Sequence, residues 1–287
     1  MLMKFRRLKV DRTTRQSETR DSLPLRPAPT DDHALARDLA VRAGELLVAL
    51  RSKAGSSAGE RWTLRDDGDM GSHHFLVDEL RVARPEDRVL SEEGAEDLRR
   101  IGAGRVWIVD PLDGTREFGE IDRTDWAVHV ALVIDDHLAV GAVSLPAQGL
   151  VFSTLEPPVL PPRDTSGPPR MVVSRSRPHP ATILAAETLG ADLVPMGSAG
   201  AKAMAVVRGD VDAYAHAGGQ YEWDSAAPAA VAIAAGLHVS GVDGTELEWN
   251  KADPWQPHLL ICREELAAPV VAAVQAAIRR QPGGGRA

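Results

Sequence analysis

Two aspartates that could bind a metal ion, Asp110 and Asp113, stand three positions apart, directly after the apolar residues 106–109. The apolar run predicts a buried strand. Because Pro111 cannot extend the hydrogen-bond ladder of a strand, we expect the chain to turn directly after Asp110. The two carboxylates would then lie at the end of the strand, where they could coordinate a divalent cation.

A glycine and a threonine, Gly114 and Thr115, follow these aspartates. Glycine permits a close backbone approach, and the next amides could donate to an anion if a helix begins near Thr115. For Asp-Gly alone, a turn at a strand end is the simpler interpretation. The whole run from 107 to 118 favours a site where a cation and a phosphate meet.

Further carboxylates occur at the ends of other predicted elements. Glu92 and Glu93 follow a predicted strand at 88–90, and Asp224 precedes an alanine-rich predicted helix at 225–235 that it could also cap. Bringing these acids beside the two aspartates would raise their pKa values and oppose folding unless a cation were present. All the donors are hard oxygens, which favours Mg²⁺ or Mn²⁺ over Zn²⁺. Two such ions could hold a phosphate, activate water and neutralise a leaving oxygen.

Histidine and serine patterns do not compete with this hypothesis. His73 and His74 are adjacent, so their rings point apart on a helix or strand, and no third histidine stands at ligand spacing. No serine lies in a nucleophile-elbow pattern.

Length and composition predict a globular protein with a substantial core. With 287 residues, 44% of them hydrophobic, it can form one large domain or two intimate halves. A net charge of −8 argues against a nucleic-acid polymer or a membrane surface as partner. The single cysteine, Cys262, excludes an intrachain disulfide, lies in an apolar run that predicts a buried thiol, and fits a reducing cytoplasm.

The chain divides into three predicted parts. Residues 1–30 carry eight Lys or Arg against three acids and are expected to form a disordered basic tail. Residues 31–160 are expected to be α+β, and residues 161–287 α/β, with a proline-rich surface connection at 156–170 between them. The first half has a predicted helix from about 31 to 50 and a meander at 126–134, 138–145 and 150–154. The second half has predicted strands at 171–174, 192–195, 211–215 and 259–262 and predicted helices at 199–208 and 225–235.

Three segments together resemble the inositol monophosphatase superfamily of lithium-sensitive, Mg²⁺-dependent phosphatases. They are Ser91-Glu92-Glu93, the run 107–115 and the run 223–227, and the resemblance extends from about residue 31 to 278. It implies a layered α-β-α-β-α sandwich, which agrees with the α+β and α/β halves.

Within this superfamily the chain is most similar to the CysQ branch, the 3'(2'),5'-bisphosphate nucleotidases. The branch features are Arg116-Glu117-Phe118, 174–176, 197–202 and the Gly-Gly pair before Gln220. They imply removal of the 3'-phosphate of 3'-phosphoadenosine 5'-phosphate, giving AMP and phosphate within sulfur assimilation, with the 5'-phosphosulfate relative as a second substrate. Inositol monophosphate and fructose 1,6-bisphosphate are the alternative substrates.

The resemblance also assigns roles to individual residues. Glu92, Asp110 and the Leu112 carbonyl would hold the first metal ion. Asp110, Asp113 and Asp224 would hold the second, and a third, weaker ion would lie near Glu92 and Asp69. Thr115 and Asp69 would orient and deprotonate the attacking water. The substrate would contact Gly114 and Thr115, and its second phosphate would contact Ser198 and Lys202, although Lys202 could instead be an ordinary solvated helix lysine.

One segment departs from the pattern of the family. The family usually shows Val-Thr-x-x-Asp where this chain has residues 65–69, Arg-Asp-Asp-Gly-Asp. Gly68 predicts a mobile loop there.

Two other functions are considered. Aspartyl-phosphate phosphotransferases share an Asp-x-Asp-Gly-Thr loop, but their aspartates stand two apart rather than three. A metal-dependent sensor that has lost turnover is the non-enzymatic alternative. The expected partner is a small phosphorylated substrate, a bisphosphate nucleotide, and a homodimer is left open.

Overall fold

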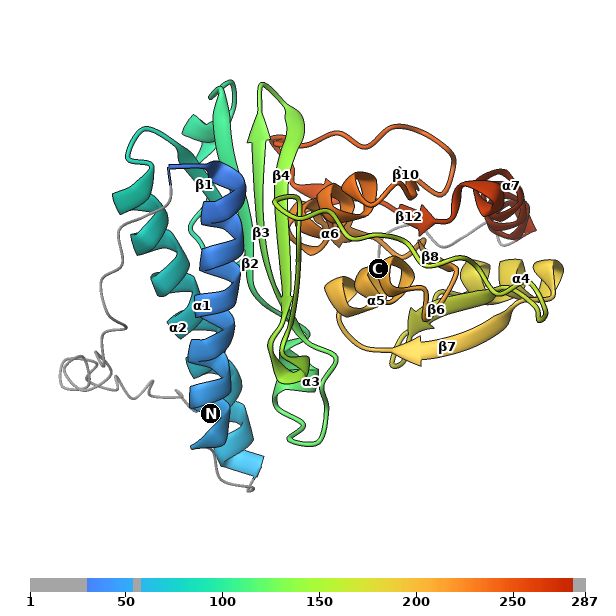
Figure 1. Cartoon of the computed structure of the whole chain (residues 1–287), viewed down its shortest axis with the longest axis horizontal. Coiled ribbons are helices and arrows are strands. Elements are labelled where there is room, and N and C mark those ends of the chain that lie inside the picture. Colours follow the sequence, from blue (N-terminus) through green and yellow to red (C-terminus); the bar gives the residue numbers. More distant parts are fainter. Residues whose placement is uncertain (1–29, 54–57, 281–287) are drawn as a thin grey trace, which may run out of the picture.

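In the computed structural model, which describes residues 30–53 and 58–280, helices and sheets alternate in five layers (Figure 1). The first layer contains α1 (Asp32–Ser52) and α2 (Ala58–Ala83), the third α5 (Ala199–Arg208) and α6 (Glu222–Ala234), and the fifth α4 (Pro180–Leu189) and α7 (Glu264–Arg280). The predicted α-β-α-β-α sandwich is therefore confirmed. The predicted basic tail lies outside the described residues, apart from Thr30.

The second layer is a five-stranded sheet in the order β1-β2-β3-β4-β5. Its strands are β1 (Arg88–Ser91), β2 (Arg105–Asp113), β3 (Ala127–Ile134), β4 (His137–Leu145) and β5 (Leu150–Ser153). β1 is parallel to β2, and the remaining neighbours are antiparallel. The predicted meander is thus present as β3, β4 and β5.

The fourth layer is a second five-stranded sheet in the order β10-β12-β8-β6-β7. Its strands are β6 (Arg170–Ser174), β7 (Asp192–Met196), β8 (Ala213–His216), β10 (His238–Ser240) and β12 (Leu259–Cys262). A two-stranded ribbon pairs β9 (Gln220–Tyr221) with β11 (Trp255–Gln256). Residues 154–169 carry no helix or strand, and the division of the chain into two halves near residue 160 stays a prediction.

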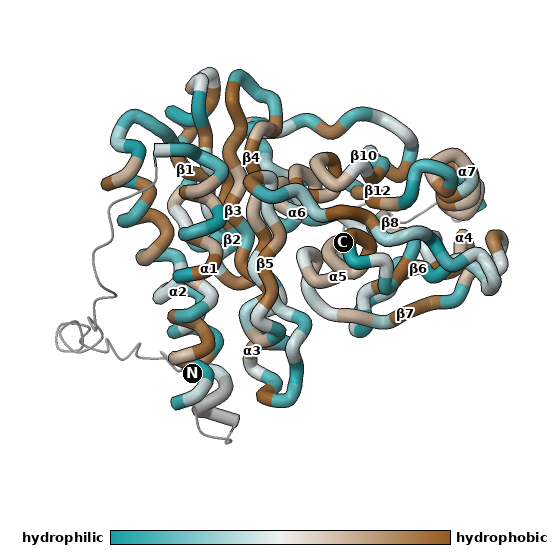
Figure 2. Tube along the Cα trace, in the orientation of Figure 1, coloured by the Kyte–Doolittle hydropathy of each residue, from teal (hydrophilic) through white to brown (hydrophobic). Residues whose placement is uncertain are grey.

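The cores lie between the layers. Figure 2 shows hydrophobic residues concentrated along the strands of the first sheet, and each sheet buries both faces. Cys262 is buried in β12, as expected, and burial raises the pKa of its thiol to about 12. Among the described helices, none combines the length and the apolar character that a membrane crossing requires.

The predicted turn directly after Asp110 is wrong. β2 continues to Asp113, and the ladder with β3 shifts register between Asp110 and Asp113. Such a bulge accommodates Pro111, because the extra residues need no ladder partner. Side chains satisfy the displaced backbone: Ser72 donates to the Pro111 carbonyl at 2.8 Å, and the Leu112 amide donates to the Asp110 carboxylate at 3.0 Å. The helix expected near Thr115 is present as α3 (Thr115–Phe118).

The mobile loop predicted at residues 65–69 is also wrong, because these residues lie within α2. Gly68 serves close packing rather than mobility. A Cβ at this position would lie 2.8 Å from the ring of Phe118 and 3.0 Å from Leu112. The glycine therefore brings α2 against β2 and α3, which places Asp69 beside the end of the strand.

A second glycine sets how closely α6 approaches the first sheet. A Cβ on Gly141 of β4 would lie 2.5 Å from the Ala230 Cβ and 2.9 Å from the Ala227 carbonyl oxygen. We expect Gly141→Ala to push α6 outward and lower the free energy of unfolding by about 1–3 kcal/mol. Denaturant unfolding would measure this, with Gly167→Ala as control, because no heavy atom lies within 4 Å of a Cβ there. Equal stability of the two variants would contradict the expectation.

Candidate metal and phosphate site

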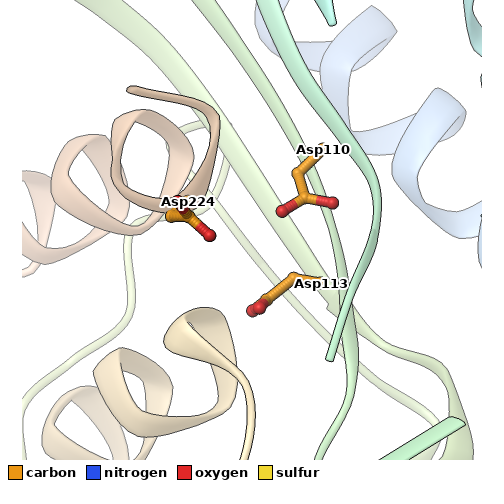
Figure 3. Close-up of side chains that lie close together, drawn as sticks. All are labelled: Asp110, Asp113 and Asp224. Atoms are coloured by element: carbon orange, nitrogen blue, oxygen red, sulfur yellow. The ribbon is translucent and has the colours of Figure 1, made fainter. Parts of the chain in front are cut away.

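Three carboxylates from two distant segments converge between the first sheet and α6 (Figure 3). Asp110 and Asp113 come from β2, and Asp224 comes from the first turn of α6. One oxygen of each lies within 4.8 Å of the others, and Asp110 and Asp113 are 1% and 6% exposed. Three buried or half-buried hard oxygen donors so close together form an arrangement that could hold a metal ion.

The electrostatics of the cluster favour a bound cation. Burial, followed by the charges of Glu92 and Asp113, raises the pKa of Asp110 well above its ordinary value. Burial and Asp113 raise the pKa of Asp224 to about 6. Glu92, the other predicted ligand, is exposed and is not one of the three clustered acids, although desolvation and the charge of Asp224 raise its pKa to about 8. Burial and mutual repulsion make the ionised form of these carboxyl groups unfavourable, and a bound cation would stabilise that form.

Asp113 differs from its neighbours because the start of α5 surrounds it with donors. The backbone amides of Ala199 and Gly200 donate to its carboxylate at 3.0 and 2.6 Å, and the Ser198 hydroxyl also donates to it. Burial opposes ionisation, but His129, Lys202 and Ser198 hold the pKa of Asp113 well below its usual range. Asp113 is therefore ionised and already oriented before a cation arrives.

His129 is a residue of this site that the sequence analysis missed. It is fully buried in β3, its Nε2 lies 3.2 Å from Asp113, and its Nδ1 lies 3.0 Å from the Trp223 carbonyl oxygen. Burial alone would lower the pKa of His129, but Asp113 and the Trp223 carbonyl raise it. One imidazole thus connects β2 to the start of α6. A lone histidine within the apolar run 126–134 was the available signal in the sequence.

We expect His129→Leu to weaken divalent-cation binding about 10- to 100-fold, as loss of a partner of a metal ligand does. The reason is that Asp113 and the Trp223-Asp224 segment lose their common tether. Titration calorimetry with Mn²⁺ would measure the change. His137→Leu, on the exposed start of β4, is the matched control. Equal Mn²⁺ affinity in both variants would show that His129 does not align the carboxylates.

Asp69 and Thr115 meet at the edge of the cluster. The Thr115 hydroxyl lies 3.1 Å from the Asp69 carboxylate and 3.2 Å from the Leu112 carbonyl oxygen. Burial, only partly offset by the Thr115 hydrogen bond, raises the pKa of Asp69 to about 7. Both expected water-handling residues and the expected Leu112 carbonyl therefore lie together. His73, which the sequence analysis did not expect to bind a metal ion, has a different contact: its ring hydrogen-bonds with the Ser91 hydroxyl at 2.8 Å.

Ser198 and Lys202 lie at the start of α5, where the Ser198 hydroxyl contacts Asp113. Both are buried, and the Lys202 ammonium donates to the Ser198 carbonyl at 2.6 Å and lies 5.2 Å from the Tyr214 ring centre. The alternative of a solvated helix lysine is therefore wrong. Gly114 has a φ of 85°, and a Cβ there would lie 3.0 Å from the Ser198 Cβ. The glycine thus permits α3 to approach α5 closely.

Three of the four segments that carry the CysQ-branch resemblance, 116–118, 174–176 and 197–202, contact one another beside this site. Arg175 donates to Glu117 at 2.6 Å and to Glu120 at 2.8 Å. A Cβ on Gly197 would lie 2.3 Å from the Glu117 carboxyl carbon. These segments, which are far apart in the sequence, therefore pack against one another in the folded chain.

The comparison with protein families matches residues 32–279 to the inositol monophosphatase family. The chain belongs to this family. Among the relatives of this chain, a Mycobacterium leprae protein named 3'-phosphoadenosine 5'-phosphate phosphatase is 47% identical to it, over 86% of this chain and 94% of that protein. The Escherichia coli K12 protein named 3'(2'),5'-bisphosphate nucleotidase CysQ is 32% identical over 63% of this chain and 78% of that protein.

Solved structures agree with the inositol monophosphatase fold. CysQ from Bacteroides thetaiotaomicron superposes with a TM-score of 0.67 at 26% identity, covering 81% of this chain and 97% of that chain. Inositol monophosphatase II from Staphylococcus aureus superposes with a TM-score of 0.69 at 19% identity, covering 84% and 96%. The second likeness supports the fold alone.

Proposed function

We propose that this inositol monophosphatase family member is a Mg²⁺-dependent phosphomonoesterase that removes the 3'-phosphate of 3'-phosphoadenosine 5'-phosphate. The observation that carries the proposal is the convergence of Asp110, Asp113 and Asp224 beside the Thr115–Asp69 pair. The name of the 47% identical relative supports the choice of substrate. AMP and phosphate are the products, and the 5'-phosphosulfate relative is a second substrate. We place this activity in the cytoplasm and leave a homodimer as a prediction.

The donor set supports two Mg²⁺ positions, because carboxylate and carbonyl oxygens suit this ion. Glu92, Asp110 and the Leu112 carbonyl would hold one ion, and Asp110, Asp113 and Asp224 the other. Asp69, with Glu92, would serve a third, weaker position. When bound, the ions supply positive charge that polarises the phosphate and stabilises the leaving oxygen.

Protein side chains would position the reactants. Asp69 has a pKa near 7 and accepts a hydrogen bond from Thr115, so it is suited to take a proton at neutral pH, while Thr115 orients the water. Gly114 lets the backbone approach the scissile phosphate closely. For the second phosphate we propose Ser198 and Lys202, which supply a hydroxyl and an ammonium group. Ser198 must exchange its Asp113 partner to make that contact.

Phosphate release from three substrates tests the proposal. We expect kcat/KM for 3'-phosphoadenosine 5'-phosphate to exceed that for inositol 1-phosphate and fructose 1,6-bisphosphate by roughly tenfold or more. EDTA should abolish release, Mg²⁺ should restore it, and Li⁺ should inhibit it. Equal rates on inositol phosphate would overturn the substrate assignment. Tight nucleotide binding without any release would indicate a sensor, and a trapped phospho-aspartate would indicate covalent chemistry.

A further inference from the structure

Three aromatic side chains gather at the start of α6, next to the carboxylate cluster. Tyr221 stacks on Trp223 with ring centres 4.6 Å apart and an interplanar angle of 13°, and it meets Trp255 at 5.3 Å in a T-shaped contact. The chain contains only two tyrosines, six tryptophans and four phenylalanines. A quarter of its aromatic residues other than histidine therefore lie at one place.

This aromatic cluster, Tyr221, Trp223 and Trp255, is connected directly to the metal-binding segments. The backbone N–H of Tyr221 donates to the Asp224 carboxylate at 2.6 Å. The carbonyl of Trp223 is the partner of His129, which also contacts Asp113. The backbone that carries the Tyr221 and Trp223 rings is consequently held beside the carboxylates that would bind the phosphate.

The backbone is adapted to hold the cluster. A Cβ on Gly219 would lie 1.9 Å from the Trp255 ring, and Gly219 has a φ of 78°. Only glycine both adopts this conformation without strain and leaves room for the indole. Gly219, the second glycine of the pair before Gln220, therefore leaves room for the Trp255 indole to contact Tyr221.

Packing explains part of the cluster but not its exposure. Tyr221 and Trp255 are opposite each other in the β9–β11 ribbon, which accounts for their mutual contact. Yet Tyr221 remains 42% exposed, although a tyrosine whose only role was packing would gain from being covered. A partly exposed ring backed by a second ring is a surface on which a flat heterocycle can stack.

We propose that Tyr221, supported by Trp223 and Trp255, stacks against the nucleobase of the substrate and selects nucleotides over base-free phosphates. The inference rests on the proposed function and extends it to a residue that reads the base. A nucleotide whose 3'-phosphate lies at the carboxylates has its base one ribose away. Tyr221 is three residues from Asp224, and its backbone N–H donates to the Asp224 carboxylate, so this residue stands directly beside the site at which the 3'-phosphate would lie.

Product inhibition tests this proposal, because the two products differ in having a base. We expect Tyr221→Leu to raise the inhibition constant of AMP about 5- to 150-fold, the range of a lost base–aromatic stack, and to leave that of inorganic phosphate unchanged. Tyr221→Phe keeps a ring and should restore most of the AMP affinity. Trp62→Leu removes another exposed aromatic residue, 67% exposed on α2, and should change neither constant.

The outcomes separate this inference from the proposed function. If the wild-type protein releases no phosphate from the nucleotide, the proposed function fails. If it does, and Tyr221→Leu leaves AMP inhibition unchanged or weakens AMP and phosphate equally, the stacking inference fails alone. Photolabelling of the wild-type protein with 8-azido-AMP needs no variant to fold. Label on the peptides that contain Tyr221 or Trp255 supports the inference, and label only elsewhere overturns it.

Discussion

Asp110→Asn is expected to reduce phosphate release about 10³-fold or more while making the metal-free protein more stable. Both metal positions that we propose share Asp110, so its loss should exceed the 10- to 100-fold cost of losing a partner of a ligand. The stability gain follows from burial, because Asp110 is 1% exposed among other acids and its pKa is raised well above normal. An amide of the same shape removes this repulsion and keeps the Leu112 hydrogen bond. The melting temperature should rise by roughly 2–4 °C for each kcal/mol gained.

Opposite effects on activity and stability distinguish a metal ligand from a structural acid. A structural aspartate would lose stability on substitution, and activity would fall only because the protein unfolds. Asp78→Asn provides the control, because Asp78 is exposed on α2 and pairs only with Arg81 among the contacts described. It should change neither activity nor melting temperature beyond a small amount. An Asp110→Asn protein that is active with Mg²⁺, or that melts at a lower temperature without metal, would contradict the proposed cluster.

Raising the pH from 5 to 8 is expected to destabilise the metal-free protein, and Mg²⁺ is expected to cancel most of the loss. The folded-state pKa is about 6 for Asp224, about 7 for Asp69 and about 8 for Glu92. A carboxyl group whose pKa is raised by folding contributes stability below its unfolded pKa near 4, and this contribution is lost as the pH rises through the folded pKa. The three values place the loss between about pH 4 and pH 8.

Two groups act with the opposite sign. Burial lowers the pKa of His216 to about 4, so the cost of keeping it neutral falls as the pH rises toward its unfolded value near 6.5, and this gain offsets part of the loss. Asp113 acts outside this range. Its lowered pKa stabilises the folded protein above the unfolded value near 4, and that contribution falls only at more acidic pH. Differential scanning fluorimetry with EDTA should therefore show a melting temperature that falls by roughly 5–10 °C between pH 5 and pH 8. With saturating Mg²⁺ the slope should nearly disappear. Identical slopes with and without Mg²⁺ would show that these acids do not bind the ion.

Elements with a clear pattern were predicted well from the sequence. Asp31 caps α1, and the apolar face through residue 50 is buried, because spacing and capping suffice to specify such a helix. The meander was predicted because short polar breaks separate its apolar runs. α2 was not predicted, and a loop was expected at residues 65–69, since charged residues and two glycines lie between Leu64 and the next buried leucine of this helix, Leu76. Packing against β2, through Gly68, is consistent with this helical placement.

By itself, the sequence identified the family and predicted which acids the site would use, because residue type and spacing along the chain carry both. The tertiary structure alone decided how these acids are held. It extended β2 past Pro111 through a bulge, wrapped Asp113 with the start of α5, and placed His129 between Asp113 and Trp223. The contacts to α5 and to the start of α6 join residues that are 87 and 94 positions apart. No local pattern encodes them, since only the packing of the layers brings such segments within hydrogen-bonding distance.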